Sequence, residues 1–143
     1  MGEVGYKTLA IDIETFSDVD LIKCGVYAYA DSPAFEILLF AYSFDDEETK
    51  IIDLAHGEQL TEEIKNALSD VGIIKTELNA DCESTCLSKY MGVRLSPESW
   101  VCTAVQSAML ALPLSLEGVG AVLGLSEQKL KEGKDLIRYF CVP

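Results

Sequence analysis

The chain has 143 residues, which is long enough for one domain with a substantial core and too short for two, so we expect a single domain over residues 1–143. Its content of 49% hydrophobic and 24% charged residues is typical of a globular protein, and no apolar stretch is long enough to cross a bilayer. The formal net charge of −13 argues against a nucleic-acid surface built on positive charge alone, because such affinity comes mainly from Lys and Arg.

The first seven residues lack the positive region and apolar core of a signal peptide, so we expect a cytoplasmic protein with no membrane association. The cysteines are odd in number and irregularly spaced, which favours small buried hydrophobes over a disulfide framework. A zinc site is disfavoured, because the sequence has no Cys-x-x-Cys pair and only one histidine. The cysteines are Cys24, Cys82, Cys86, Cys102 and Cys141.

The first half of the chain predicts three strands. An apolar, β-branched run predicts the first strand at 8–13, and the alternation in the connector that follows predicts an extended segment at 25–30. A second strand at 35–44 leads through an acidic turn at 45–48 to a third strand at 50–54, which together form an antiparallel hairpin.

The second half alternates helices with short strands. Asn79 or Asp81 can cap the helix that leads to Met91. Pro113 and Gly124 are predicted breaks between later helices. The expected elements are a helix from Thr61, a strand at 72–78, a helix from Asp81 or Cys82 to Met91, a strand at 99–103, and helices at 104–112, 116–123 and 127–140. We therefore expect an α/β fold with a mixed central sheet, an antiparallel meander followed by parallel strands, flanked by helices.

Two carboxylates end the first predicted strand. Asp12 and Glu14 point to the same face, with their Cα atoms about 6.6 Å apart, and burial there requires a cation. A third carboxylate is Glu83, in the first turn of a helix entered directly from a strand, and Asp81 is a rival on the same turn. Several converging carboxylates can hold the two metal ions that phosphodiester hydrolysis uses.

The sequence segments that contain these acidic residues resemble the motifs of a known family. The run Asp-Ile-Glu-Thr-Phe-Ser from Asp12 to Ser17, followed by Asn79-Ala80-x-x-Glu83, is similar to the first two motifs of the DEDD superfamily of 3′→5′ exonucleases. The similarity is closest to the proofreading exonuclease domain of family A DNA polymerases from phages and prophages. Residues 23–29, 112–119 and 131–136 also resemble that group.

The resemblance implies a ribonuclease H-like three-layer fold and a 3′→5′ exonuclease that removes nucleotides from a single-stranded DNA 3′ end. It implies two Mg²⁺ or Mn²⁺ ions as cofactors and a polymerase domain or polypeptide as partner. By the same resemblance Asp12, Glu14 and Glu83 are catalytic and bind metal. It also gives the substrate-binding residues, which are Thr15, Phe16 and Asn79.

The sequence departs from the family pattern at three points. Cys82 stands where the family has a large aromatic residue, and Asp81 where an uncharged one is typical. The last family motif places an aspartate behind a Tyr-x-x-x or His-x-x-x-x lead, and no such pairing follows the second motif. We therefore expect a domain that is incomplete at its C-terminus and lacks its fourth carboxylate. This expectation leaves open a catalytically silent remnant that binds a DNA end or a polymerase. A phosphatase with an Asp12 nucleophile is a weaker alternative, because its supporting motifs are missing.

Other conspicuous side chains have structural interpretations. Tyr27 and Tyr29 alternate near the predicted sheet, and we expect them, like Trp100, to lie in the core rather than to stack on bases. The late basic residues are expected on a solvated helix face, with phosphate contact as the alternative. These basic residues are Lys129, Lys131, Lys134 and Arg138.

Overall fold

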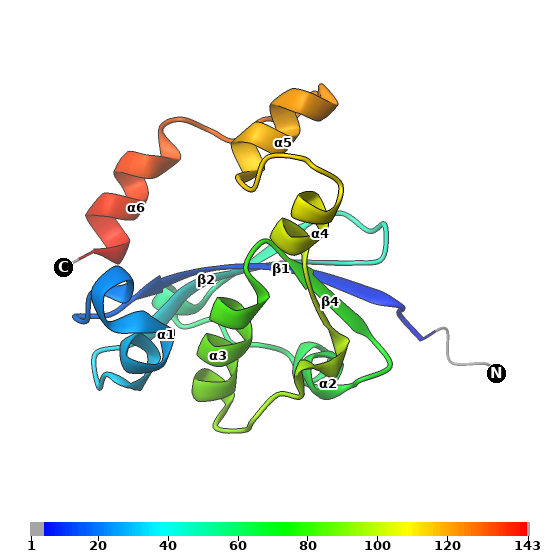
Figure 1. The fold of residues 1–143 in the computed structure, drawn as a ribbon. Coiled ribbons are helices and arrows are strands. Elements are labelled where there is room, and N and C mark those ends of the chain that lie inside the picture. Colours follow the sequence, from blue (N-terminus) through cyan, green and yellow to red (C-terminus); the bar gives the residue numbers. More distant parts are fainter. Residues whose placement is uncertain (1–4, 143) are drawn as a thin grey trace.

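The computed structural model describes residues 5–142, which form a five-stranded sheet with helices on both sides (Figure 1). The strand order is β3-β2-β1-β4-β5, where β1, β2 and β3 are an antiparallel meander and β4 and β5 run parallel to β1. The expected mixed α/β architecture is confirmed. The strands are β1 (Thr8–Phe16), β2 (Glu36–Phe44), β3 (Lys50–Asp53), β4 (Ile74–Glu77) and β5 (Trp100–Cys102).

Helices cover both faces of this sheet. Figure 1 shows α2 and α3 on one side and α4, α5 and α6 on the other. Within residues 5–142, no helix combines the length and apolar character needed to span a bilayer. The helices are α1 (Leu21–Asp31), α2 (Glu62–Ser69), α3 (Ala80–Met91), α4 (Thr103–Met109), α5 (Leu116–Leu123) and α6 (Gly133–Cys141), with short 3-10 turns η1 (Leu54–His56) and η2 (Pro97–Ser99).

The alternation along β1 decides which side chains enter the core. Leu9, Ile11 and Ile13 are buried in one hydrophobic cluster with Leu68 of α2 and Leu87 of α3. Because successive strand residues point to opposite faces, the acidic residues between these positions face the other side of the sheet. The burial of one face of β1 therefore directs its acids toward the layer of α4, α5 and α6.

The segment at 25–30 is helical, so the predicted extended conformation is wrong. Asp20 caps α1 by accepting hydrogen bonds from the amides of Ile22 at 3.0 Å and Lys23 at 3.1 Å. The helix kinks at Gly25, whose φ of 80° lies in the left-handed region. After the kink the tyrosines diverge, since Tyr29 is buried whereas Tyr27 is 79% exposed. The prediction of a core position is thus confirmed for Tyr29 and wrong for Tyr27.

Helix α3 follows β4 almost directly, as the sequence predicts. Asn79 occupies its N-cap position, but the Asn79 side chain makes no capping hydrogen bond. Asp81 lies inside the first turn of α3, so its predicted role as the cap is wrong. The helix ends at Gly92, where φ is 68°.

The remaining predicted elements agree with the structure except near the C-terminus. The helix expected over 127–140 begins only at Gly133. The connector before it folds back on α5, because the Gln128 side-chain amide donates to the carbonyl of Gly120 at 3.1 Å. Lys129 and Lys131 therefore lie in this connector rather than on a helix, and all four late basic residues are exposed as expected.

The cysteine prediction is only partly right. Cys86 is buried and packs in the core, whereas Cys24 is exposed on α1 and the other three are half-buried. Cys24 is exposed because it lies on the short first half of α1, before the kink at Gly25. Trp100 is half-buried and packs against the core.

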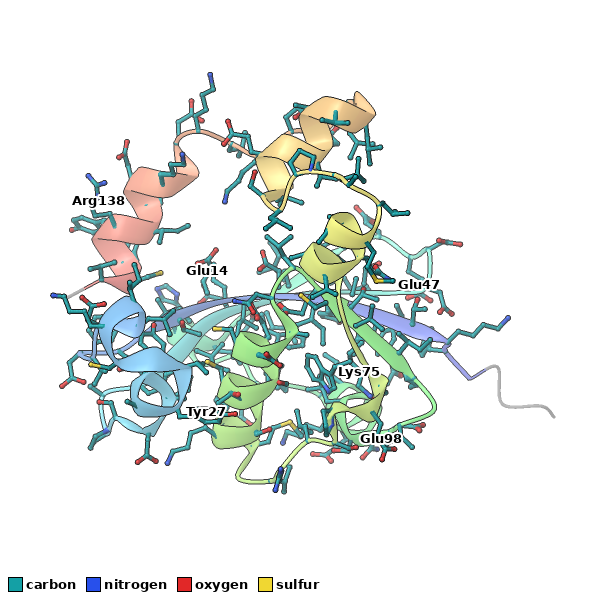
Figure 2. All side chains as sticks on the ribbon, in the orientation of Figure 1. Glu14, Tyr27, Glu47, Lys75, Glu98 and Arg138 are labelled. Carbon is teal, nitrogen blue, oxygen red and sulfur yellow. The ribbon has the colours of Figure 1, made fainter. Side chains whose placement is uncertain are left out.

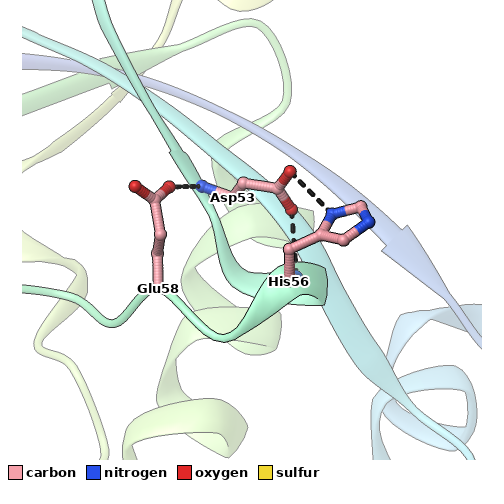
Figure 3. Close-up of polar contacts among 3 residues, drawn as sticks. All are labelled: Asp53, His56 and Glu58. Carbon is pink, nitrogen blue, oxygen red and sulfur yellow. Dashed lines mark hydrogen bonds and ion pairs between the residues drawn. The ribbon is translucent and has the colours of Figure 1, made fainter.

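The only histidine of the sequence stabilises a turn. His56 Nδ1 lies 2.8 Å from Asp53 Oδ2, and the His56 amide donates to Asp53 Oδ1 at 3.2 Å (Figure 3). Glu58 accepts a hydrogen bond from the Asp53 amide in the same turn. These contacts cap η1 beyond β3, which β2 separates from β1, so His56 is not part of the acidic site on β1.

Candidate active site

Asp12 and Glu14 lie two residues apart on β1, on the face opposite the core. Asp12 is exposed and Glu14 is half-buried. Desolvation by neighbouring atoms raises the pKa of Asp12 and the pKa of Glu14. The negative charge of Asp12 raises the pKa of Glu14 further. The predicted pair is therefore adjacent, and its two negative charges oppose each other.

Glu83 approaches this pair because β4 lies beside β1. The two strands are parallel, with Ala10 opposite Thr76, so the end of β4 and the start of α3 lie near the acidic part of β1. Burial raises the pKa of Glu83, and the charge of Asp12 raises it further. The charge of Glu83 likewise raises the pKa of Glu14. The three predicted carboxylates thus share one electrostatic environment.

Glu83 and its rival Asp81 differ in their surroundings. Asp81 is exposed, whereas Glu83 is half-buried. One oxygen of Glu83, Oε2, is fully buried and has no hydrogen-bond partner among the described residues. Because an unpartnered buried carboxylate oxygen is costly, Glu83 is the better candidate for a cation ligand.

Glu77, which the sequence analysis missed, supports Glu83. Glu77 is 5% exposed at the end of β4. Burial and the neighbouring Glu83 raise its pKa to about 10, so Glu77 carries a proton at neutral pH that is available for a hydrogen bond to Glu83. The sequence signal that could have revealed it is an acid at the end of a predicted strand, two residues before the Asn79 turn.

The three predicted substrate-binding residues flank the acids in different ways. The Thr15 hydroxyl lies 2.9 Å from the Tyr29 hydroxyl, which ties the end of β1 to α1. Phe16 is half-buried at the last position of β1, and Asn79 is exposed at the start of α3. Their role in binding a substrate stays a prediction.

The C-terminal segment approaches the acidic pair from the opposite side. The thiol of Cys141, at the end of α6, donates a hydrogen bond to Glu14, with 3.8 Å between Sγ and Oε2. The ammonium group of Lys129 lowers the pKa of both Asp12 and Glu14, opposing the effect of desolvation. Figure 2 shows Glu14 between the sheet and α6, whereas Arg138 points outward from α6.

The side chains fit a hard divalent cation in chemical type. Mg²⁺ and Mn²⁺ prefer carboxylate oxygens, and Asp12, Glu14 and Glu83 supply them, including the unpartnered Oε2 of Glu83. Within residues 5–142, however, no three His, Cys, Asp or Glu side chains are grouped closely enough to hold a metal ion as they stand. Metal binding therefore requires these side chains to reorient.

Comparison with known proteins identifies solved structures of similar fold and one relative that is similar in sequence. No family model matches the chain. Among solved structures, Brucella melitensis NrnC has a TM-score of 0.65 at 18% identity, covering 88% of this chain and 55% of its own. The Mg²⁺-bound form of the same protein has a TM-score of 0.64 at 16% identity, covering 94% of this chain and 64% of its own. The fold is thus that of the ribonuclease H-like exonucleases.

The sequence itself is similar to a particular polymerase. It is 58% identical to the DNA polymerase of Bacillus phage SP02 over 137 residues, which are 96% of this chain. The chain spans only 21% of the length of that relative. It is therefore a domain of exonuclease fold that is homologous to part of a phage DNA polymerase.

Proposed function

We propose that this domain is a metal-dependent 3′→5′ exonuclease that proofreads for a phage-type DNA polymerase in the cytoplasm. The proposal is carried by the position of Asp12 and Glu14 on β1 relative to Glu83 in the first turn of α3, the helix that follows the parallel neighbour of β1. Homology to a phage DNA polymerase and the exonuclease fold support it. The substrate is the 3′ end of a single-stranded DNA.

Asp12, Glu14 and Glu83 would hold two Mg²⁺ or Mn²⁺ ions. When bound, the ions supply Lewis-acid activation and charge neutralisation. Hydrolysis adds water to the terminal phosphodiester and breaks the bond between phosphorus and the 3′ oxygen. The products are a nucleoside 5′-monophosphate and a strand with a new 3′ hydroxyl. Glu77 keeps Glu83 oriented through its hydrogen bond, and Thr15, Phe16 and Asn79 contact the terminal nucleotide.

The test is digestion of a 5′-labelled single-stranded oligonucleotide with Mn²⁺ or Mg²⁺. We expect a ladder of products shortened from the 3′ end and no products with a chelator. Asp12→Asn and Glu83→Gln should each lower the rate by about a hundredfold or more. Asp81→Asn is the matched control and should leave the rate within about twofold, because Asp81 is exposed and is not assigned to the site.

The second candidate is a catalytically silent module that binds a DNA end or the polymerase. It is favoured by one observation: within residues 5–142, no three His, Cys, Asp or Glu side chains are grouped closely enough to hold a metal ion as they stand. Binding of the oligonucleotide without any metal-dependent shortening would support this candidate and contradict the first. Equal shortening by the wild type and Asp12→Asn would indicate a contaminating nuclease and would also contradict the first.

A further inference from the structure

A group of lysines borders the acidic site on the side of α5 and α6. A cavity of about 240 Å³ is lined by Lys129, Lys131 and Lys134, together with Leu130 and Glu117. With three lysines and one glutamate, its lining is positive in a chain whose formal net charge is −13. We call these three lysines the lysine cluster.

The lysine cluster is not neutralised by ion pairs. Elsewhere in the molecule Lys23, Lys65 and Lys89 each have a carboxylate oxygen within 4.0 Å. Over the part of the chain that the structure describes, Lys129, Lys131 and Lys134 have no such contact. Their ammonium groups are therefore free to meet an external anion.

The fold holds this cluster beside the acidic pair. Helix α6, which follows the connector of Lys129, lies against β1, where Cys141 contacts Glu14. Figure 1 shows α5 and α6 on one side of the sheet, and Asp12 and Glu14 face that same side. The carboxylates on β1 and the lysine cluster therefore lie on the same side of the sheet, an arrangement that suits a nucleic-acid strand reaching from one to the other.

We propose that the lysine cluster binds backbone phosphates of the nucleic-acid strand whose 3′ end lies at Asp12, Glu14 and Glu83. This inference rests on the proposed exonuclease function. It explains how so acidic a domain holds a polyanion, since local positive charge on one side and bound cations on the other replace a basic surface. Lys129 is then a substrate-binding residue rather than a catalytic one.

The test measures binding separately from cleavage. A 5′-fluorescein oligothymidylate with cleavage-resistant phosphorothioate linkages at its 3′ end is titrated with protein in Mg²⁺, and anisotropy is recorded across a range of salt concentrations. Lys129→Glu should weaken binding by about tenfold and reduce the slope of log K against log salt by about 0.7. Lys129→Arg keeps the positive charge and should therefore retain most of the wild-type affinity for the oligonucleotide.

Arg138→Glu is the matched control. Arg138→Glu reverses one positive charge, as Lys129→Glu does, but at a position within α6. The Arg138 side chain points away from Glu14 in Figure 2. Its effect should be less than about twofold, and circular dichroism checks that each variant is folded. Equal weakening by Lys129→Glu and Arg138→Glu, or no weakening by either, would overturn the inference while leaving exonuclease activity untouched. Lysine-dependent binding without any cleavage of an ordinary oligonucleotide would support it and contradict the proposed function.

Discussion

The thiol of Cys141 lies 3.8 Å from Oε2 of Glu14 and donates to it, although the two residues are 127 positions apart. This contact closes α6 onto β1 at the acidic pair. Because a thiol is a weak donor, the contact holds α6 only loosely.

We therefore expect Cys141→Ala to loosen α6. Tryptic cleavage after Lys134 and Arg138 should become about two- to fivefold faster, the change that a loss of about 0.5–1 kcal/mol produces. Limited proteolysis followed by mass spectrometry measures it. Cys24→Ala, at an exposed position on α1, is the control. Cleavage rates equal to those of the wild type would show that the contact does not restrain α6.

We expect Glu77 to position Glu83 by donating its carboxyl proton in a hydrogen bond. Glu77→Gln keeps a hydrogen-bond donor beside Glu83, so we expect exonuclease activity within about threefold of the wild type. Glu77→Ala removes the donor and should lower activity or metal affinity by about 10–100-fold. Rates measured over a range of Mn²⁺ concentrations separate the two effects. If both variants lost activity equally, the hydrogen bond would not be what positions Glu83.

Lys75 should make the free energy of unfolding depend on pH in the alkaline range. It is 1% exposed on β4, and its ammonium group donates to the carbonyls of Asp70 at 2.6 Å and Ile73 at 2.9 Å. Lys75→Met should lower the free energy of unfolding by about 1–2 kcal/mol at neutral pH, because these carbonyls lose their donor. Urea denaturation measures this loss.

The pH dependence of the same variant follows from the lysine charge. Burial lowers the pKa of Lys75 in the folded state. Between that lowered pKa and the ordinary lysine value of about 10.4, the unfolded chain binds more protons than the folded one. The contribution of Lys75 to the free energy of unfolding therefore rises with pH in this window. We expect the wild type to gain stability relative to Lys75→Met as pH rises through it, and a constant difference would contradict this assignment.

Gly25 should be required for the kink in α1. Its φ of 80° and ψ of 167° lie in a region that is essentially restricted to glycine. Since nothing lies within 4 Å of a Cβ placed there, Gly25→Ala tests backbone strain alone. We expect a loss of about 1–3 kcal/mol in the free energy of unfolding.

Gly133→Ala is the control for that prediction. Gly133 begins α6 without a positive φ and with open space around its Cβ position, so this change should be neutral or slightly stabilising. Thermal melts compare the two variants. A Gly25→Ala variant as stable as the wild type would mean that α1 adopts another conformation at the kink.

Most of the fold could be predicted from the sequence, because hydrophobic periodicity and helix capping act locally. The runs that became β1, β2 and β4, the cap at Thr61 and the end of α3 at Gly92 all follow from neighbours in the chain. Local pattern did not distinguish strand from helix at 25–30, where alternating alanine and tyrosine suit both and where packing of Tyr29 against the core favours the helix.

Within the candidate site, the sequence identified Asp12, Glu14 and Glu83 by their positions at the ends of a strand and a turn. Their positions relative to one another depend on long-range strand pairing, since the parallel pairing of β1 with β4 brings α3 beside the acidic pair. The tertiary structure also revealed Glu77, whose proton depends on burial, and it placed Lys129, which the sequence had singled out, on the side of the sheet that the acids face. Burial and long-range contact set the surroundings of these groups, and neither is encoded in local spacing.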